Sequence, residues 1–220
     1  ASYESGKDDR KVTKFKDIII PEKDRMPQQE LDKYVNVVFC QFRFDNLNTL
    51  RYTNPVMKWY SHAILEANIV KTSTRYRNYF DMIIYFVSKY HDGRHRILYL
   101  FSTKDMVRNF YMYLKKHNVY GKKKLAMFIE GDKDKSNLRA DVIISTDKSC
   151  GTGVDIEDVQ VTMNTISTES EYFGVQSSGR NRKMDKTEQY YLTLWATNIE
   201  AHSRYKKSNS KLFAERAKEV

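Results

Sequence analysis

The chain has 220 residues, 40% of them hydrophobic, so it is long enough for one domain with a sizeable core or for a domain with an extension. Its formal net charge is +10 at pH 7, and a field of that sign attracts phosphates. We therefore expect a polyanion as partner. A basic, soluble surface without such a partner is the alternative.

Composition argues against several classes of protein. No stretch approaches the roughly 18 consecutive apolar residues of a membrane span, and no signal leader is recognisable, which favours an intracellular protein with no membrane contact. Cys40 and Cys150 form no CxxC pair and are too few for a disulfide scaffold. The 5 histidines lack metal-ligand spacing, so we expect no structural zinc.

The chain is predicted to have three parts. Residues 1–30 are dense in charged side chains and indicate a linker or leader, and a start at Ala1 rather than Met favours a piece of a longer protein. Residues 31–196 form the predicted domain, in which 31–71 is an extension or an insertion. Residues 197–220 are polar and helix-prone, which predicts a terminal helix, either solvated or with a basic face toward nucleic acid.

The first half of the domain begins with a strand pattern. Residues 34–44 are rich in β-branched and aromatic side chains that alternate with polar ones, which predicts a strand. Asn54 and Pro55 form a cap and first-turn pair, which predicts a helix over 55–66. Apolar residues recur every three or four positions over 72–90, which predicts a long helix ended by Gly93.

From residue 96 onward, strand patterns alternate with helix patterns. Short apolar runs predict strands at 96–101, 125–129, 142–144, 159–166 and 190–195. Between the first two, Ser102 to Asp105 resembles a capping box that opens a helix. Such alternation implies right-handed crossovers, so we expect an α/β fold of three layers around a mostly parallel sheet, with an N-terminal extension.

Hydroxyl side chains follow two of these strands. Ser102 and Thr103 come after the strand at 96–101, and Ser145 and Thr146 come after the strand at 142–144. Ligands of open parallel sheets bind beyond the carboxyl ends of the strands, where hydroxyls and the N–H groups of a helix start hold phosphate oxygens. Taken alone, Ser102 is better explained as a plain helix N-cap.

A glycine-rich loop follows Thr146. It reads Gly151-Thr-Gly153-Val-Asp155, and two glycines two apart let the backbone approach a ligand closely. Taken by itself the pattern is weak, because many turns share it.

A second polar segment carries cations at a predicted helix terminus. It reads Gln176-Ser-Ser-Gly179-Arg180-Asn-Arg182-Lys183. Arginine is suited to bidentate contact with phosphate oxygens. A solvated basic helix end is the alternative.

In this order and at this separation, the segments resemble motifs of the C-terminal RecA-like domain of superfamily 2 helicases. Residues 145–155 look like the fifth motif, a Thr followed by Gly-x-Asp, and Gln176 to Arg180 looks like the sixth. Residues 96–103 are similar to the strand and Ser/Thr of the fourth. The resemblance covers roughly residues 72–195. The compact charged loop at 132–139 is similar to that of phage and large-virus helicases related to UvsW.

The resemblance implies the second lobe of a motor in which two RecA-like lobes hold ATP and Mg²⁺ between them and pull on DNA or RNA. Arg180, with Arg182 or Lys183, would face the γ-phosphate as an arginine finger. The residues implied to line the ATP cleft are Gly151, Gly153, Asp155, Gln176 and Gly179. Those implied to hold the nucleic-acid strand are Ser102, Thr103, Ser145 and Thr146.

The sequence departs from the family pattern in two respects. The family has a second Arg three residues after the first, where this chain has Lys183, with an extra Arg at 182, so the identity of the finger is open. There is also no GxxxxGK[ST] phosphate loop and no Asp-Glu pair after an apolar strand. We therefore expect ATP and Mg²⁺ to be bound mainly by an N-terminal lobe, and this chain to be inactive alone.

Two rival interpretations remain. The first is a non-catalytic nucleic-acid-binding module with a RecA-like fold, and the second is a nucleotide-dependent transferase with a Rossmann-like sheet, whose GxGxxG fingerprint is missing. If the source is viral, we expect the host cytoplasm or the virion as location. Four aromatic residues are candidates for base stacking, with core packing the favoured alternative: Phe42, Phe44, Trp59 and Tyr60.

Overall fold

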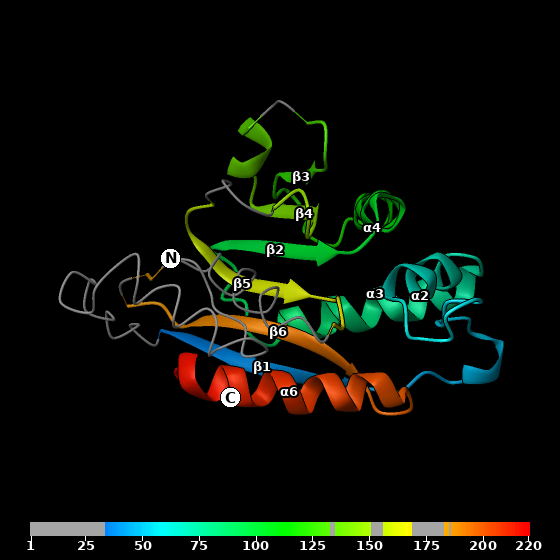
Figure 1. Cartoon of the computed structure of the whole chain (residues 1–220). Helices are drawn as coiled ribbons and strands as arrows, with labels where there is room; N and C mark the ends of the chain where they lie inside the picture. The colour runs from blue at the N-terminus through cyan, green and yellow to red at the C-terminus, as the bar shows by residue number, and fades with distance from the viewer. Residues whose placement is uncertain (1–33, 133–134, 151–155, 169–182, 185) are drawn as a thin grey trace, which may run out of the picture.

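The computed structural model describes residues 34–132, 135–150, 156–168, 183–184 and 186–220 (Figure 1). The predicted linker or leader at 1–30 lies outside them. Within them, six strands form one sheet in the order β1-β6-β5-β2-β4-β3, and all neighbours run parallel. The strands are β1 (Val35–Phe42), β2 (Arg96–Phe101), β3 (Leu125–Phe128), β4 (Val142–Thr146), β5 (Val159–Asn164) and β6 (Gln189–Ala196).

Helices cover both faces of the sheet. They are α2 (His62–Ile69), α3 (Ser73–Ser88), α4 (Lys104–Lys116) and α6 (Glu200–Arg216), with short 3-10 turns η2 (Leu47–Thr49) and η3 (Lys135–Arg139). Figure 1 shows α6 alongside β1 and β6, with α3 behind the sheet. This is the predicted three-layer α/β architecture. Among the described residues, no helix combines the length and the apolar character that a membrane span needs.

The central strand β2 shows why the apolar runs predict strands so well. Ile97, Tyr99 and Phe101 point to one face and join the large core under α2, α3 and α4. Leu98 and Leu100 point to the other face and join a second buried cluster. Because β2 is buried on both faces, both sets of alternating residues must be apolar.

The polar terminal helix also contributes to the core. Phe213 of α6 is 2% exposed and packs against Phe39 of β1 and Tyr191 of β6, at centroid distances of 6.3 and 5.6 Å. Val35 and Val37 lie in the same cluster. The helix is therefore held to the sheet by a few apolar side chains along one face.

The predicted strand at 34–44 is confirmed as β1, which pairs with β6 along its whole length at the edge of the sheet. The predicted long helix is confirmed as α3. It ends at Ser88, before Gly93, which takes a φ of +84° in the turn that leads to β2.

The prediction of a helix over 55–66 is wrong, because the helix there is α2, which begins at His62. Asn54 does cap backbone N–H groups, those of Val56 and Met57, but in a tight turn. An antiparallel bridge between Thr53 and Tyr60 closes this turn. The long-range pairing replaces the helix that the cap signal predicts.

Candidate nucleic-acid interface at the strand ends

The carboxyl ends of β2, β4 and β5 open onto a pocket of about 490 Å³. Ser102 follows β2, Asp147 follows β4, and residues 166–168 follow β5. The segment that leads into α2 and Tyr205 of α6 complete the walls. A ligand site at the carboxyl edge is what a parallel α/β sheet predicts.

The loop between β2 and α4 is held by a buried carboxylate, that of Glu66. Glu66 is 0% exposed and accepts hydrogen bonds from the N–H groups of Ser102 and Thr103, at 2.8 and 2.7 Å, and from the Thr103 hydroxyl at 2.7 Å. Thr103 Oγ1 in turn accepts from Met106 N–H at 3.2 Å. The helix cap is therefore Thr103, and the prediction of a capping box starting at Ser102 is wrong.

The amino end of α4 thus already carries an anion supplied by the chain. A helix start attracts negative charge because its first N–H groups are free and the helix dipole is positive there. The sequence predicts that Ser102 and Thr103 hold a phosphate at this position, whereas the Glu66 carboxylate occupies it in the structure. Binding of a nucleic-acid strand by Ser102 and Thr103 stays a prediction.

A chain of polar side chains connects Glu66 to α6. His202 Nδ1 accepts from Ala196 N–H at 3.0 Å, so its Nε2 carries the proton and donates to the Tyr60 hydroxyl at 2.7 Å. Tyr60 then donates to His62 Nδ1 at 2.6 Å. His62 Nε2 carries a proton and lies 3.4 Å from the Glu66 carboxylate. These tautomers follow because Nδ1 of each histidine accepts a hydrogen bond, which leaves the proton on Nε2; His62 Nε2 itself makes no hydrogen bond among the described residues.

Burial sets the protonation states of two side chains in this hydrogen-bonded series, His202 and Tyr60. It lowers the pKa of His202 to about 3, with His62 nearby as a smaller cause, so His202 is neutral at pH 7. Burial also raises the pKa of Tyr60 well above its ordinary value of 10.0, which keeps its hydroxyl proton available as a donor. His202 and Tyr60 are therefore both uncharged at pH 7.

Acid is expected to destabilise the fold through His202. Its pKa is about 3 when folded and about 6.5 when unfolded, so below pH 6.5 the unfolded state binds a proton that the folded state does not. The stabilisation is complete above pH 6.5 and falls toward pH 3, by up to about 1.4 kcal/mol per pH unit. Urea unfolding between pH 7 and pH 4 measures this slope.

The matched comparison is between two histidine substitutions. His202→Gln should show a smaller slope than the wild type, whereas His117→Gln, at an exposed position, should not. Burial also lowers the pKa of His91, which contributes equally to all three proteins. An unchanged slope in His202→Gln would exclude His202 as the acid-sensitive group.

Asp147 places a carboxyl group in the wall of the pocket. Burial raises its pKa, an effect that hydrogen bonding and charge from Lys148 partly offset. Its Oδ1 atom is buried without a hydrogen-bond partner among the described residues. An acceptor of this kind favours a donor from a ligand, such as a sugar hydroxyl or a base amino group, over a phosphate oxygen.

Ser145 and Thr146 lie inside β4, not after it, and both are buried. The Ser145 hydroxyl donates to the carbonyl oxygen of Phe128 in the neighbouring strand. Thr146 Oγ1 accepts from Ser149 N–H at 3.2 Å and lies 2.7 Å from Ser149 Oγ. Thr146 thus shapes the turn after β4, and its contact with a nucleic-acid strand stays a prediction.

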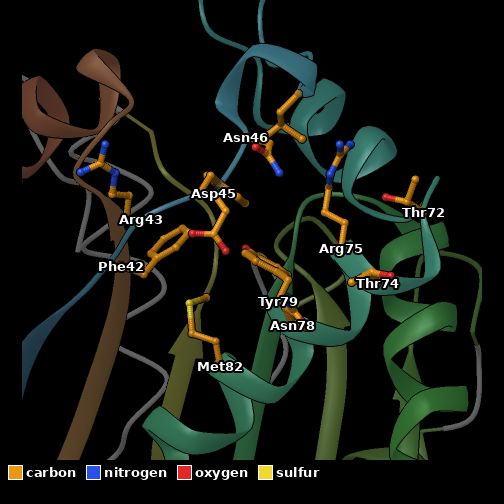
Figure 2. Close-up of a pocket in the computed structure, with 12 residues that line it drawn as sticks. Phe42, Arg43, Asp45, Asn46, Thr72, Thr74, Arg75, Asn78, Tyr79 and Met82 are labelled. Atoms are coloured by element: carbon orange, nitrogen blue, oxygen red, sulfur yellow. The ribbon is translucent and has the colours of Figure 1, made fainter.

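A second hollow, of about 450 Å³, lies beyond the end of β1 and against the first turns of α3. Figure 2 shows Phe42 and Tyr79 on its walls, with Arg43 and Arg75 nearer its rim. Arg75 is already engaged, because it donates to Asn68 O and Thr49 Oγ1. Apart from the base-stacking candidates Phe42 and Phe44, none of the described residues predicted to bind ATP or nucleic acid lines this hollow.

The base-stacking candidates divide in the structure. Phe42 and Phe44 pack on Tyr79 at centroid distances of 6.1 Å each, and Tyr60 packs on His202 at 4.9 Å. Trp59 instead is 60% exposed. Core packing is therefore right for three of the four.

Comparison with solved structures identifies the fold. The chain matches Saccharomyces cerevisiae Dbp5 bound to RNA and ADP BeF3 with a TM-score of 0.56 and 13% identity, over 98% of this chain and 48% of that one. It matches Mycobacterium smegmatis helicase Lhr bound to ssDNA and AMP-PNP with a TM-score of 0.51 and 9% identity, over 82% and 22%. Escherichia coli DEAD-box protein SrmB matches with a TM-score of 0.50 and 12% identity, over 66% and 89%.

The shared feature is a parallel sheet between helices, as in helicase C-terminal domains. The domain is RecA-like. The chain spans about half the length of the Dbp5 chains it matches. No protein-family model matches the sequence, and no curated protein is significantly similar to it.

Most of the predicted ATP-facing residues of this RecA-like domain lie outside the described residues. They are Gly151, Gly153, Asp155, Gln176, Gly179, Arg180 and Arg182. The described flanks show where the first segment is attached. Cys150 and Ile156, on either side of it, are 3% and 1% exposed and belong to one buried cluster.

Lys183 lies within the described residues. It is near the amino-terminal ends of the strands, on the side of the sheet opposite the pocket at the carboxyl ends. Met184 N–H donates to Gln189 Oε1 at 3.1 Å, and Gln189 Nε2 donates to Val159 O at 2.9 Å. These bonds fix the residue after Lys183 beside the amino ends of β5 and β6. The RecA-like sheet therefore separates Lys183 from the hydroxyls at the carboxyl ends of β2 and β4.

Proposed function

We propose that this chain is the second RecA-like lobe of a superfamily 2 ATP-dependent helicase or translocase of the phage and large-virus type, acting on DNA or RNA. One observation carries the proposal. The predicted fifth-motif Thr146 ends β4, next to β2, the strand that leads into Ser102 and Thr103. The predicted strand contacts are thus neighbours on one edge of a RecA-like sheet, where a parallel sheet binds its ligands.

In this proposal Arg180, with Arg182 or Lys183, stabilises charge on the γ-phosphate of ATP held by the other lobe. Gly153 and Asp155 line the same cleft. Lys183 lies near the amino-terminal ends of the β-strands. This position supports an arrangement in which ATP and the nucleic-acid strand contact opposite ends of the sheet.

Magnesium is assigned to the other lobe. The described residues hold no group of three or more His, Cys, Asp and Glu side chains that suits a metal ion. The sequence also lacks a phosphate loop. The part of the chain that the structure describes therefore does not fit a Mg²⁺ site, and the proposal gives this chain no metal-bound step.

ATP hydrolysis by one lobe and by two lobes tests the proposal. The complete two-lobe protein should hydrolyse ATP with strong stimulation by nucleic acid, whereas the 220-residue chain alone should not hydrolyse it. Tight mononucleotide binding by the chain alone would contradict the motor and favour a nucleotide-dependent transferase. Nucleic-acid binding without stimulated hydrolysis in any two-lobe protein would favour the non-catalytic module.

A further inference from the structure

The turn before α2 holds three large apolar side chains in solvent. Val56 is 80% exposed, Met57 59% and Trp59 60%. We name residues 51–60 the Trp59 turn. It also carries Arg51 and Lys58, both exposed, and no acidic residue. Single exposed apolar residues are common on protein surfaces, but exposed apolar residues that cluster mark interaction sites. The cluster beside two cations therefore indicates a binding surface.

The Trp59 turn is held in one conformation by hydrogen bonds of the Asn54 side chain and backbone. Asn54 Oδ1 accepts from the N–H groups of Val56 and Met57, at 2.9 Å each. Asn54 O accepts from Lys58 N–H at 2.9 Å, and Asn54 N–H donates to Trp59 O at 2.8 Å. A turn fixed in this way presents its side chains with little ordering cost on binding.

The Trp59 turn is also anchored at the strand ends. Tyr60, the residue after Trp59, turns inward, and its hydroxyl lies between His62 and His202. Tyr60 lines the same pocket as Ser102. Figure 1 shows the chain between β1 and α2 running beyond the arrowhead ends of the strands. The exposed indole is therefore attached beside the edge where the strand contacts are predicted.

We propose that the Trp59 turn is a base-stacking site for single-stranded nucleic acid, in which Trp59 stacks on a base and Lys58 and Arg51 pair with phosphates. The proposal deepens the proposed function, since it rests on nucleic acid as the ligand. An aromatic face accepts any base, and cations without neighbouring acids attract the backbone. This charge pattern, on a chain of net charge +10, favours nucleic acid over a protein partner.

The chain offers a direct optical test because it has only 2 tryptophans. Trp195 contacts Ser203 and Lys206, and Trp195→Phe keeps an aromatic ring there while leaving Trp59 as the only indole. In this variant, short oligo(dT) or oligo(U) should quench the fluorescence of Trp59 in step with binding. Heparin, a polyanion without bases, should bind without that quenching.

Affinity gives an independent readout. Trp59→Ala should raise the Kd for the labelled oligonucleotide about tenfold, whereas Trp59→Phe should keep most of the affinity. Trp59 is exposed, so the urea midpoint should not change in either variant. Should Trp59→Ala fail to fold, Lys58→Glu should raise the Kd several-fold through repulsion of phosphate.

The outcomes separate this proposal from the proposed function. Oligonucleotide binding without quenching, and with normal affinity in Trp59→Ala, would overturn the stacking site and leave the helicase lobe intact. A second outcome is normal oligonucleotide affinity in Trp59→Ala but reduced ATP hydrolysis in the two-lobe protein. It would show that the Trp59 turn contacts the other lobe, which also overturns the base-stacking proposal. No nucleic-acid binding by either protein would contradict both proposals.

Discussion

Replacement of Arg180 by alanine in the complete two-lobe protein should lower nucleic-acid-stimulated ATP hydrolysis by about 1,000-fold or more, the scale of an arginine finger. The guanidinium is always charged and its planar fork matches two phosphate oxygens, so it stabilises charge that develops on the transferring phosphoryl group. The measurement is steady-state hydrolysis with saturating nucleic acid. The affinity for nucleic acid should stay within a few-fold of wild type, because the loss is in the chemical step.

Three further substitutions identify the residue that completes the finger. Arg182→Ala and Lys183→Ala should differ, and the larger loss marks the second phosphate contact. Lys183→Arg restores the spacing of the family pattern and should keep or raise the rate if position 183 is the contact. Lys186→Ala, at a nearby exposed position, is the matched control and should have no effect. Near-wild-type hydrolysis in Arg180→Ala would exclude the sixth-motif assignment.

The sheet was predictable because its strands are buried on both faces. A strand such as β2 can place only apolar residues on either side, so its apolar run and its bounds in the chain coincide. The same rule applies to β4, although its last residues, Ser145 and Thr146, are polar and buried. Hydrogen bonds to Phe128 and Ser149 satisfy them, which a sequence pattern does not reveal.

The Trp59 turn shows where local signals are insufficient. An Asn-Pro pair caps N–H groups equally well in a helix and in a turn. The choice between them depends on the bridge from Thr53 to Tyr60 and on the contact of Tyr60 with His202, which lies 142 residues away. Local propensity cannot include such a contact.

The sequence predicted where the candidate site lies, but not the buried hydrogen bonds that hold its residues in place. Parallel strands bring Ser102 and Thr146 to one edge, which follows from the strand pattern alone. Glu66 was missed, since its partners Ser102 and Thr103 are 36 and 37 residues away. The available signal was an acidic residue on the apolar side of a helix, four positions after His62.

Removal of the Glu66 carboxylate should be among the most destabilising single changes in the chain. Glu66→Ala should lower the free energy of unfolding by about 3–5 kcal/mol, because the N–H groups of Ser102 and Thr103 lose a buried charged acceptor. Glu66→Gln keeps the shape and one acceptor oxygen, so it should cost about half as much. Urea unfolding at pH 7 measures both.

Glu130→Ala is the matched control, because Glu130, in the loop after β3, pairs at 3.1 Å with Lys104, the first residue of α4, but is exposed. It should change the free energy of unfolding by less than about 1 kcal/mol. A loss as small as this in Glu66→Ala would show that the contacts of Glu66 contribute little.

Oligonucleotide affinity then distinguishes two roles for the start of α4. We expect Glu66→Gln to weaken binding, because the loop of Ser102 and Thr103 loses its support; stronger binding would instead show that phosphate competes with Glu66 for these N–H groups.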